Sequence, residues 1–352
     1  MKAVLFGAHG GPEVLRYTDL PEPTAGPNDV VVKVRAAAAN FNDIWARRGL
    51  PGMKVVLPHV SGSDVAGDVV EVGSEVSGVS VGDAVLVHPG LGCRNCQACA
   101  AGQEVLCREF RIWGFQTGPN DGGHAEFVRL PGYNVVPKPT NLTYGEAASL
   151  PLVLETVWRM LSTRAKVRPG QFVLIWGAAG GLGTMAIQVA RVFGAVPIAV
   201  VGDEAKVPIC KELGAEHVIN RQSQDFAAQV MEITGKRGVD VVFEHTGQAT
   251  WETSIRCMRW HASLVVCGAT SGFEGKTDLR FLWNKQLNLL GSHLGTKAEL
   301  LEALSFVEMG RIRPVVRTVL PLSEVARGQT MMEERESMGK IVYLPDGSAD
   351  ED

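Results

Sequence analysis

The sequence has little excess charge of either sign and no long apolar run. Lys and Arg together number 34 against 38 Asp and Glu, which gives a net charge of -4. This balance argues against a general nucleic-acid binder, which needs a surplus of basic residues. No apolar run approaches the ~20 residues of a membrane-spanning helix, and the opening MKAVLFGAHGG lacks the segments of a secretory signal. We therefore expect a cytoplasmic protein that binds neither nucleic acid nor membranes.

Repeats and low-complexity tracts are also missing from the 352 residues. Hydrophobic residues make up 45% of the chain and charged residues 20%, so there is enough apolar material for a core and no reason to expect global disorder. A single core rarely extends over a chain of this length, so the length predicts about two domains.

Cysteine is scarce, but four of the seven cysteines form a C-x2-C-x2-C-x7-C cluster at Cys93, Cys96, Cys99 and Cys107. Four thiolates can surround one tetrahedral ion and leave no position open for substrate, which is typical of a structural zinc site. We predict one structural zinc ion in a lobe at about residues 91–108. An iron–sulfur cluster and disulfides are the alternatives, and disulfides are disfavoured without a secretory signal. The remaining cysteines lie in apolar contexts and are predicted to be small buried hydrophobes: Cys210, Cys257 and Cys267.

Two regions differ in their pattern of apolar residues. Short alternating runs at residues 30–34, 65–72 and 83–87, separated by Gly, Pro and Asp, predict a compact β-rich domain. From residue 167 onward, apolar runs alternate with helical stretches. The predicted strands are residues 172–176, 197–201, 217–220, 240–243, 263–267 and 287–290, and the predicted helices are 184–193, 206–213 and 225–234. This β-α-β order predicts an α/β fold with a doubly wound parallel sheet. Residues 296–344 are expected to hold another helix and a strand.

A glycine-rich segment, GAAGGLG, joins the first of these strands to the following helix. Backbone amides at such a helix start can bind the pyrophosphate of a dinucleotide. The G-x-x-G-x-x-G spacing differs from the strict fingerprint, but the strand before it and the helix after it support the same interpretation. The loops after the strands at 240–243 and 263–267 end at the same sheet edge. The predicted cofactor-binding residues here are Gly177, Ala179, Gly180, Gly181, Gly183, Thr246, Gly247, Gly268, Ala269 and Thr270.

The choice between NADPH and NADH depends on the end of the second strand, where an acidic side chain would accept hydrogen bonds from the ribose 2′-OH. Asp203 lies about twenty residues past the third glycine, as that rule requires, but it is two positions beyond the last apolar residue, Val201. Lys206 and Arg221 are nearby cations that could hold a 2′-phosphate. We predict NADPH, with NADH and a purely surface role for both cations left open.

The order of these parts resembles the medium-chain dehydrogenase/reductase superfamily over nearly the whole chain. The resemblance implies a GroES-like catalytic domain at residues 1–151 and 293–352 and a Rossmann domain at residues 152–292. In the zinc alcohol dehydrogenases of this superfamily, a Cys, a His and another Cys or acidic residue hold the catalytic zinc. The matching positions here are Asn40, Ser63 and Leu152, which form no zinc ligand set. The resemblance therefore implies hydride transfer without catalytic zinc.

A narrower resemblance, strongest from residue 111 on, is to crotonyl-CoA carboxylase/reductases and related enoyl-thioester reductases. It is carried by RIWGF, IWGAAGGLGTMAIQ, INR, EHTGQAT, DLRFLW and GSH. The Asn, Phe, Glu and His of that family's carbon dioxide pocket match Asn42, Phe115, Gln116 and His293. Because Gln116 replaces the glutamate, simple reduction is favoured over carboxylation.

The resemblance and the motifs together predict an NADPH-dependent reductase of activated carbon–carbon double bonds. Enoyl-CoA thioesters such as crotonyl-CoA or acryloyl-CoA are the favoured substrates, with hydride delivered to the β-carbon. Asn42 would donate to the developing oxyanion, Gln116 and His293 would position a donor or water, and Phe115 would exclude solvent. The alternatives for these residues are a turn or helix cap at Asn42, a loop residue at Gln116 and a buried structural imidazole at His293.

Other functions stay open from the sequence alone. They are a quinone oxidoreductase, a zinc-type alcohol dehydrogenase, a reductive enoyl-CoA carboxylase and an NADPH-binding protein without turnover. The strand at residues 287–290 could leave an open sheet edge, which predicts a homodimer or homotetramer. The remaining histidines singled out are expected to be structural or at the surface: His59, His88, His124, His217 and His261.

Overall fold

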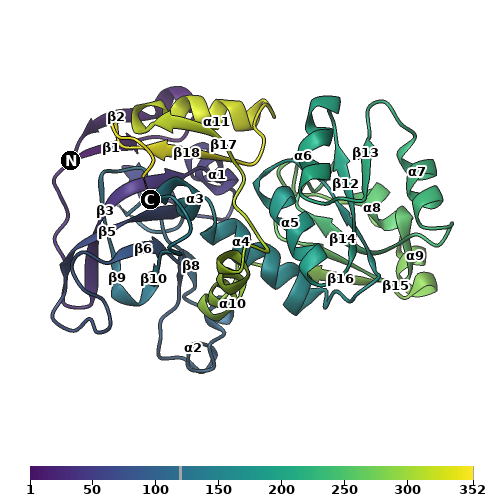
Figure 1. Cartoon of the computed structure of the whole chain (residues 1–352), viewed down its shortest axis with the longest axis horizontal. Coiled ribbons are helices and arrows are strands. Elements are labelled where there is room, and N and C mark those ends of the chain that lie inside the picture. Colours follow the sequence, from purple (N-terminus) through teal and green to yellow (C-terminus); the bar gives the residue numbers. More distant parts are fainter. Residues whose placement is uncertain (119–120, 352) are drawn as a thin grey trace. The chain divides into compact units, whose positions relative to one another are not determined.

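The computed structural model describes residues 1–118 and 121–351 and divides into two compact units (Figure 1). Unit 1 comprises Met1–Leu152, Thr296–Glu308 and Pro314–Asp352, and unit 2 comprises Val153–Gly295 and Met309–Arg313. The expected boundaries were residues 151/152 and 292/293, so the main difference is the short return of the chain to unit 2. Gln188 explains this return, because its side chain bonds to both the backbone oxygen (3.0 Å) and the backbone nitrogen (2.9 Å) of Arg313.

The strands of unit 1 are β1 (Lys2–Phe6), β2 (Arg16–Asp19), β3 (Asp29–Ala38), β4 (His59–Val60), β5 (Asp64–Val72), β6 (Ala84–Val87), β7 (Gly90–Leu91), β8 (Arg111–Ile112), β9 (Phe127–Pro131), β10 (Val135–Pro137), β17 (Val316–Pro321) and β18 (Lys340–Leu344). Its helices are α1 (Phe41–Arg48), α2 (Gln97–Ala100), α3 (Tyr144–Ala148), α10 (Lys297–Glu308) and α11 (Val325–Glu333), and 3-10 turns cover Pro12–Val14, Glu104–Leu106, Gly132–Asn134 and Leu322–Glu324.

The strands of unit 2 are β11 (Phe172–Ile175), β12 (Val196–Val201), β13 (His217–Asn220), β14 (Val239–Glu244), β15 (Met258–Val266) and β16 (Asn288–Gly291). Its helices are α5 (Gly181–Val192), α6 (Val207–Glu212), α7 (Phe226–Ile233), α8 (Trp251–Cys257) and α9 (Leu279–Lys285), with a 3-10 turn at Glu204–Lys206. Helix α4 (Pro151–Trp158) begins in unit 1 and continues into unit 2, where a π-helical turn follows at Arg159–Arg164. In the described part of the chain, no helix is long and apolar enough to cross a membrane.

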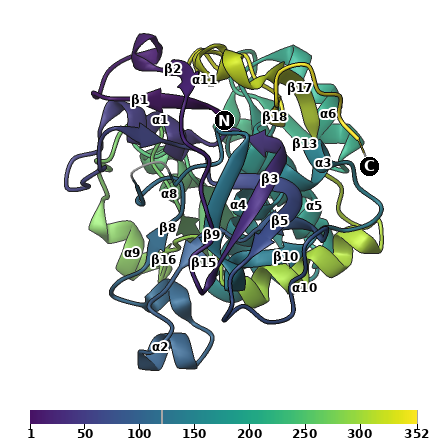
Figure 2. The same cartoon turned by 90° about the vertical axis from the view of Figure 1, so that its left-hand side faces the viewer.

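Strand β3 organises the main sheet of unit 1. The sheet has the order β10-β6-β5-β3-β18-β17, and β9 also pairs with β3. Figure 2 shows β3 running beside β5 and β9. The sequence DVVVKVRAAA explains this central position, because its β-branched residues suit a pleated strand and most of them are buried. Burying each of these valines contributes about 1.5–3 kcal/mol relative to exposure. The sheet forms the β-rich half that the alternating pattern predicted.

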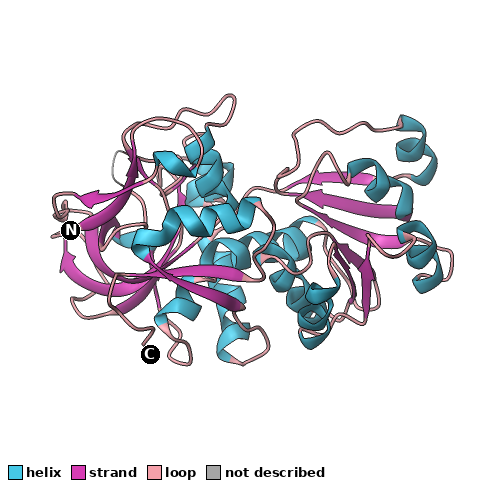
Figure 3. Ribbon diagram, turned by 90° about the horizontal axis from the view of Figure 1, so that it is seen from above, coloured by secondary structure: helices cyan, strands magenta, loops and turns pink. Residues whose placement is uncertain are grey.

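The sheet of unit 2 has six parallel strands in the order β13-β12-β11-β14-β15-β16. The strand order reverses between β11 and β14, so right-handed crossovers must place helices on both faces, as Figure 3 shows. Most residues of β11, β12 and β14 are buried, which explains why their sequences read as continuous apolar runs. The predicted α/β fold with a Rossmann-type sheet is confirmed.

The C-terminal segment differs from its prediction. One helix and one strand were expected over residues 296–344, but the structure has α10, β17, α11 and β18. Strand β17, VRTVLP, has exposed residues at every second position and only Leu320 buried, and Arg317 and Thr318 interrupt its apolar residues, so it gives no apolar run. Strand β18, KIVYL, is buried throughout and pairs antiparallel with β3. This pairing brings Lys340, the first residue of β18, into the interior of unit 1.

Candidate functional site

The four clustered cysteines of unit 1 converge on one point. The sulfur atoms of Cys93, Cys96, Cys99 and Cys107 all lie within 4.8 Å of one another, and the Cys93 and Cys99 sulfurs are 4.0 Å apart. These distances are too long for a disulfide and fit ligands of a single ion bound tetrahedrally with Zn–S bonds of about 2.3 Å. The thiolates of a four-iron cluster bind separate irons and need wider spacing. The cluster can therefore hold one tetrahedral metal ion.

The cysteine lobe is fixed to unit 1 by Glu104, which lies between its last two cysteines. The buried Glu104 carboxylate accepts a hydrogen bond from the backbone nitrogen of Lys297, the first residue of α10, at 2.6 Å. His88 lies against the same carboxylate at 3.7 Å. Two cations also stack on Tyr133, with Arg94 at 4.5 Å and Lys297 at 4.4 Å from its ring centre. In Figures 1 and 2, the lobe around α2 projects from the rest of unit 1.

A buried lysine lies among the residues that match the catalytic-zinc positions. The ammonium of Lys340 donates to Asn40 Oδ1 at 2.7 Å and to Asp64 Oδ2 at 2.9 Å. Asn40 Nδ2 donates to the same Asp64 oxygen at 2.8 Å, and the Leu152 backbone nitrogen donates to Asp64 Oδ1 at 2.8 Å. Lys340 and Asp64 are 5% and 0% exposed, so this is a buried ion pair in which both carboxylate oxygens are already bonded.

Ser63 occupies another matching position and bonds to Asn42 of α1. The Asn42 amide nitrogen donates to the Ser63 hydroxyl at 2.9 Å, while Asn42 Oδ1 is buried and has no hydrogen-bond partner in the described structure. An amide, a hydroxyl and an aliphatic side chain are poor zinc ligands, and the only carboxylate among them is paired with an ammonium. These donors do not fit a catalytic zinc ion. Within residues 1–118 and 121–351, the cysteine cluster is the one group of three or more His, Cys, Asp or Glu side chains that could hold a metal.

Asp43 supports the start of α1 from within the core. Its fully buried carboxylate accepts hydrogen bonds from the Asn40 and Gly62 backbone nitrogens at 2.8 and 3.2 Å. Burial raises the pKa of Asp43 to about 7, although these bonds and Lys340 act in the opposite direction. His124 lies 3.9 Å from the Asp43 carboxylate, and burial lowers the pKa of its imidazole to about 3. His124, whose protonated form is disfavoured, and Asp43, whose protonated form is favoured, therefore lie side by side in the core at α1.

The loop that carries Phe115 and Gln116 packs against the Gly62–Ser63 backbone. A Cβ at Gly114 would lie 1.9 Å from the Gly62 oxygen, so only glycine permits this approach. Asn42 bonds to the side chain of Ser63. The Phe115 loop and Asn42 therefore both contact the Gly62–Ser63 segment of unit 1. Phe115 is buried, and Gln116 is half-buried, with its Oε1 accepting from the Ile112 nitrogen at 2.9 Å.

His293, the fourth predicted catalytic residue, belongs to unit 2 and follows β16. Burial lowers the pKa of its imidazole, and the nearby Arg159 guanidinium lowers it further. A neutral imidazole can donate from one ring nitrogen and accept at the other, which is what positioning a water or donor requires.

The glycine loop of unit 2 runs from the end of β11 to the start of α5. Gly177 has a φ of +55, and a Cβ there would lie 2.9 Å from the His245 ring. A Cβ at Gly183 would lie 2.3 Å from the Gly177 oxygen, so the first turn of α5 packs directly on the loop. Gly180 is the N-cap residue of α5 and has no side chain to bond the free amides. The loop therefore presents unblocked backbone N–H groups at a helix start, as a pyrophosphate requires.

At the end of β12, the sequence prediction weighed Asp203 against two cations. Asp203 Oδ1 accepts from the Ala205 nitrogen at 3.0 Å and caps the following 3-10 turn. The Arg221 guanidinium lies beside Gly202, because a Cβ there would be 3.6 Å from Arg221 Nε. The Arg221 backbone nitrogen also bonds to the Val201 oxygen at 3.0 Å, so the chain holds Arg221 at the strand end. Lys206 ends the 3-10 turn that Asp203 caps.

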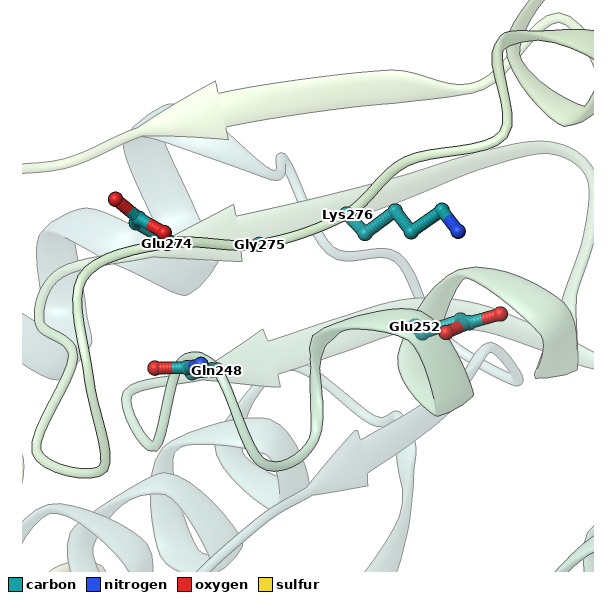
Figure 4. Close-up of a pocket in the computed structure, with 5 residues that line it drawn as sticks. All are labelled: Gln248, Glu252, Glu274, Gly275 and Lys276. Atoms are coloured by element: carbon teal, nitrogen blue, oxygen red, sulfur yellow. The ribbon is translucent and has the colours of Figure 1, made fainter.

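A pocket of about 380 Å³ opens between the loops that follow β14 and β15. Figure 4 shows Gln248 and Glu252 on one wall and Glu274, Gly275 and Lys276 on the other. Lys276 extends toward the side on which Glu252 lies, and the pKa of Glu252 is lowered mainly by its hydrogen bond from Arg256. Its lining side chains are all polar or charged, whereas ligand pockets are lined mainly by apolar and aromatic side chains, so we do not assign hydride transfer to it.

Sequence reasoning missed three buried ionisable residues at α1 and below it. Lys340, Asp64 and Asp43 were not among the predicted site residues, although one signal was available. Lys340 is a cation at the start of an otherwise apolar strand, KIVYL, and a buried lysine requires an acidic partner. Which acid pairs with it depends on the tertiary pairing of distant strands.

Comparisons with known proteins find similar proteins for both units. Residues 26–140 match the alcohol dehydrogenase GroES-like domain family, and residues 181–309 match the zinc-binding dehydrogenase family. A crotonyl-CoA carboxylase/reductase of Cereibacter sphaeroides is 34% identical over 96% of this chain and 86% of its own length. The crystal structure of an NAD-dependent alcohol dehydrogenase matches 98% of this chain and 99% of its own with a TM-score of 0.93 and 42% identity. A 2-octenoyl-CoA carboxylase reductase solved with NADP and 2-octenoyl-CoA matches 98% of this chain and 87% of its own, with a TM-score of 0.90 and 32% identity.

Proposed function

Because the chain belongs to the medium-chain dehydrogenase/reductase superfamily and is an NAD(P)H-dependent oxidoreductase, we propose that it reduces activated carbon–carbon double bonds with NADPH. Enoyl-CoA thioesters of the crotonyl-CoA or acryloyl-CoA type are the proposed substrates. The similarity to a crotonyl-CoA carboxylase/reductase and to a 2-octenoyl-CoA carboxylase reductase supports this class.

The observation that carries the proposal is the Lys340–Asp64–Asn40 cluster. In an alcohol dehydrogenase, a zinc ion polarises the alcohol oxygen. Here Asn40, Ser63 and Leu152 occupy the matching positions, the Lys340 ammonium bonds to Asn40 and Asp64, and Asp64 has both oxygens bonded. A reaction at these residues therefore requires a substrate in which the reacting carbon is already activated by the substrate's own carbonyl group. An α,β-unsaturated thioester meets this requirement, since the hydride goes to its β-carbon and the charge moves to the thioester oxygen.

Asn42 is the proposed donor to that oxygen. With its present orientation the amide nitrogen bonds to Ser63 and the oxygen has no partner. A flip of the amide would let the Ser63 hydroxyl donate to Oδ1 and would release Nδ2 to donate to the enolate oxygen. Phe115 would keep water from the reaction, and Gln116 and His293 would position the donor that protonates the α-carbon. One hydride from NADPH and one proton complete the reduction.

The proposed dinucleotide site is the carboxyl edge of the unit 2 sheet, where the glycine loop presents free amides. Arg221 beside Gly202 is the proposed ligand of the 2′-phosphate, with Lys206 in support, and this favours NADPH over NADH. The proposed cofactor contacts are Gly177, Ala179, Gly180, Gly181, Gly183, Thr246, Gly247, Gly268, Ala269 and Thr270. We also propose that the metal of the cysteine cluster is one structural zinc ion, because four thiolates suit zinc and leave no coordination position open.

The test follows NADPH oxidation at 340 nm with crotonyl-CoA and acryloyl-CoA, with and without bicarbonate. We expect turnover that does not need bicarbonate, and a fall of about 10-fold or more in kcat for Asn42→Ala if one oxyanion donor is lost. Asn28→Ala, at an exposed turn of unit 1, is the matched control and should retain full activity. No turnover on either thioester would overturn the substrate assignment. Products carboxylated in bicarbonate would instead identify a reductive carboxylase.

The second candidate is NAD-dependent alcohol oxidation, which the 42% identity to an NAD-dependent alcohol dehydrogenase favours. Metal analysis separates the two functions, because our proposal requires one zinc ion per chain and a zinc alcohol dehydrogenase requires a further catalytic zinc. Two zinc ions per chain would contradict the proposal. A quinone panel distinguishes quinone reduction, and binding of NADPH without oxidation by any acceptor would indicate a protein without turnover.

Self-association belongs to the same proposal. Strand β16 is the last strand of the unit 2 sheet and has one sheet neighbour, β15, in the described structure. Its free edge can pair with the same strand of a second copy about a two-fold axis. We expect a homodimer or a homotetramer, which sedimentation velocity would measure. A monomer at micromolar concentration would contradict this expectation.

A further inference from the structure

Glu244 ends β14 and is a fully buried carboxylate beneath the loop that leads to α8. Its Oε1 accepts from the Thr246 and Gly247 backbone nitrogens at 2.7 and 3.0 Å. Its Oε2 accepts from the Thr250 and Ser254 hydroxyls, both at 2.9 Å. All four donors are neutral, and all come from the loop or from the start of α8. The carboxylate therefore holds this loop by hydrogen bonds alone.

The same carboxylate is linked to the glycine loop. Ser254, which donates to Glu244, accepts from the indole nitrogen of Trp176 at 2.7 Å. Trp176 directly precedes Gly177, and its backbone oxygen bonds to His245 Nε2 at 2.8 Å. Two connections thus join the segment after β11 to the segment after β14. The Glu244 carboxylate takes part in the first of these connections through Ser254.

The loop after β15 is tied to the same assembly. The Ser271 hydroxyl donates to the Thr246 oxygen at 2.6 Å and accepts from the Ala249 nitrogen at 3.0 Å. The Thr270 backbone nitrogen bonds to the His245 oxygen at 3.3 Å. The three loops assigned to the dinucleotide are therefore one hydrogen-bonded group, in which Glu244 is the buried carboxylate.

We infer that Glu244 is a positioning residue for the dinucleotide, because its carboxylate holds the Thr246–Gly247 loop and, through Ser254 and Trp176, the glycine loop in their binding arrangement. This inference rests on the proposed cofactor site but not on the proposed substrate. A buried carboxylate is costly unless its oxygens are bonded. Without it, the Thr246 and Gly247 amides would lose their acceptor and the loop would be free to move away from the cofactor.

The test measures the Kd for NADPH by the fluorescence of the bound nicotinamide, which needs no substrate. Glu244→Gln keeps one oxygen for the two amides and should raise the Kd about 3- to 10-fold, and Glu244→Ala should raise it further. Ser254→Ala removes the link to Trp176 together with one of the four donors to Glu244, leaves the two backbone amides bonded, and should raise the Kd by about 2-fold. The matched control is Asp240→Asn. Asp240 lies at the amino end of the same strand, where it accepts from the Phe172 nitrogen at 2.8 Å and pairs with Arg259.

Thermal unfolding of each variant separates positioning from simple stability. We expect Asp240→Asn to lower the melting temperature and leave the Kd for NADPH unchanged. We expect Glu244→Gln to raise the Kd for NADPH while its melting temperature is similar to that of Asp240→Asn. An unchanged Kd in both Glu244 variants would overturn the inference. If Glu244→Ala does not fold, the Kd values of Glu244→Gln and Ser254→Ala test the inference, and unchanged values in both would overturn it. Failure of the proposed function alone would show as normal NADPH binding by the wild type without enoyl-CoA turnover.

Discussion

The two units use buried carboxylates in different ways. In unit 1, Asp64 is paired with the ammonium of Lys340, so charge is compensated by charge within the core. In unit 2, Glu244 is held by four neutral donors from the loops above the sheet. An ion pair between two strands fixes a core, whereas a set of backbone and hydroxyl donors fixes loops. Breaking the first should cost folding free energy, and breaking the second should cost cofactor binding.

The largest expected effect is on the proposed zinc site of unit 1. Cys99→Ser removes one of four converging ligands, and structural zinc sites supply on the order of 10 kcal/mol of binding free energy to the folds that they close. We expect bound zinc to fall from about one per chain to near zero and the melting temperature to drop by 10 °C or more. Mass spectrometry of the metal and calorimetry measure the two effects. Cys210→Ala, a buried thiol of unit 2, is the control and should keep its zinc. Full zinc occupancy in Cys99→Ser would refute the four-ligand site.

The next effect concerns the ion pair. Lys340→Met leaves the Asp64 carboxylate buried without its cation, and removing one partner of a buried pair typically costs about 3–5 kcal/mol. Urea unfolding should show this loss. The double variant Lys340→Met/Asp64→Asn should recover part of it, because no unpaired charge remains. Lys33→Met, on an exposed position of β3, is the control and should change little. If the double variant is no more stable than the single one, charge compensation is not what the pair provides.

This cluster also shows where sequence reasoning stops. The strands of unit 2 and the glycine loop were predictable because an apolar run, a glycine spacing and a helix start lie next to one another in the chain. The Lys340–Asp64 pair joins residues 276 positions apart. It exists because β18 pairs with β3, which also pairs with β5. No local pattern records that pairing, so the sequence indicated that zinc ligands were missing but not which groups replace them.

The predicted catalytic residues show the same limit within one unit. Asn42, Phe115 and Gln116 were predicted from a family resemblance. The link between Asn42 and the Phe115 loop is created by two neighbouring residues, since the Ser63 hydroxyl accepts from Asn42 and the Gly62 backbone lies against Gly114. The orientation of the Asn42 amide depends on Ser63, a residue that the motifs treated only as a lost zinc ligand. Motifs can name candidates, but their hydrogen-bond partners come from the fold.

A pH series tests the buried groups beneath α1. Burial raises the pKa of Asp43 to about 7, so its contribution to stability is full below the unfolded pKa near 4 and is lost as pH rises toward 7. Burial lowers the pKa of His124 to about 3, so its contribution is full above the unfolded pKa near 6.5 and is lost as pH falls toward 3. The two contributions oppose each other between about pH 4 and 6.5.

Asp43→Asn removes the contribution to stability that declines as pH increases, and His124→Gln removes the contribution that grows as pH increases. Urea unfolding at pH 4.5, 5.5 and 6.5 should therefore show stability rising more steeply with pH in Asp43→Asn than in the wild type. His124→Gln should show the reverse. Each slope should change by up to about 1.4 kcal/mol per pH unit, the value for one proton. Parallel profiles in all three proteins would mean that neither group titrates differently on folding.

The smallest effect lies in unit 2, where charge is expected to act on the ligand and not on the fold. If Arg221 binds the 2′-phosphate, Arg221→Ala should raise the Kd for NADPH about 10-fold, since a charge-assisted hydrogen bond contributes about 1.5 kcal/mol or more. The Kd for NADH should stay the same, because NADH has no 2′-phosphate, and the melting temperature should stay the same because Arg221 is exposed. Lys211→Ala, an exposed cation on α6, controls for net charge. Equal weakening of NADPH and NADH would assign Arg221 to the loop and not to the phosphate. Unit 2 would then resemble unit 1, with its charges serving the fold.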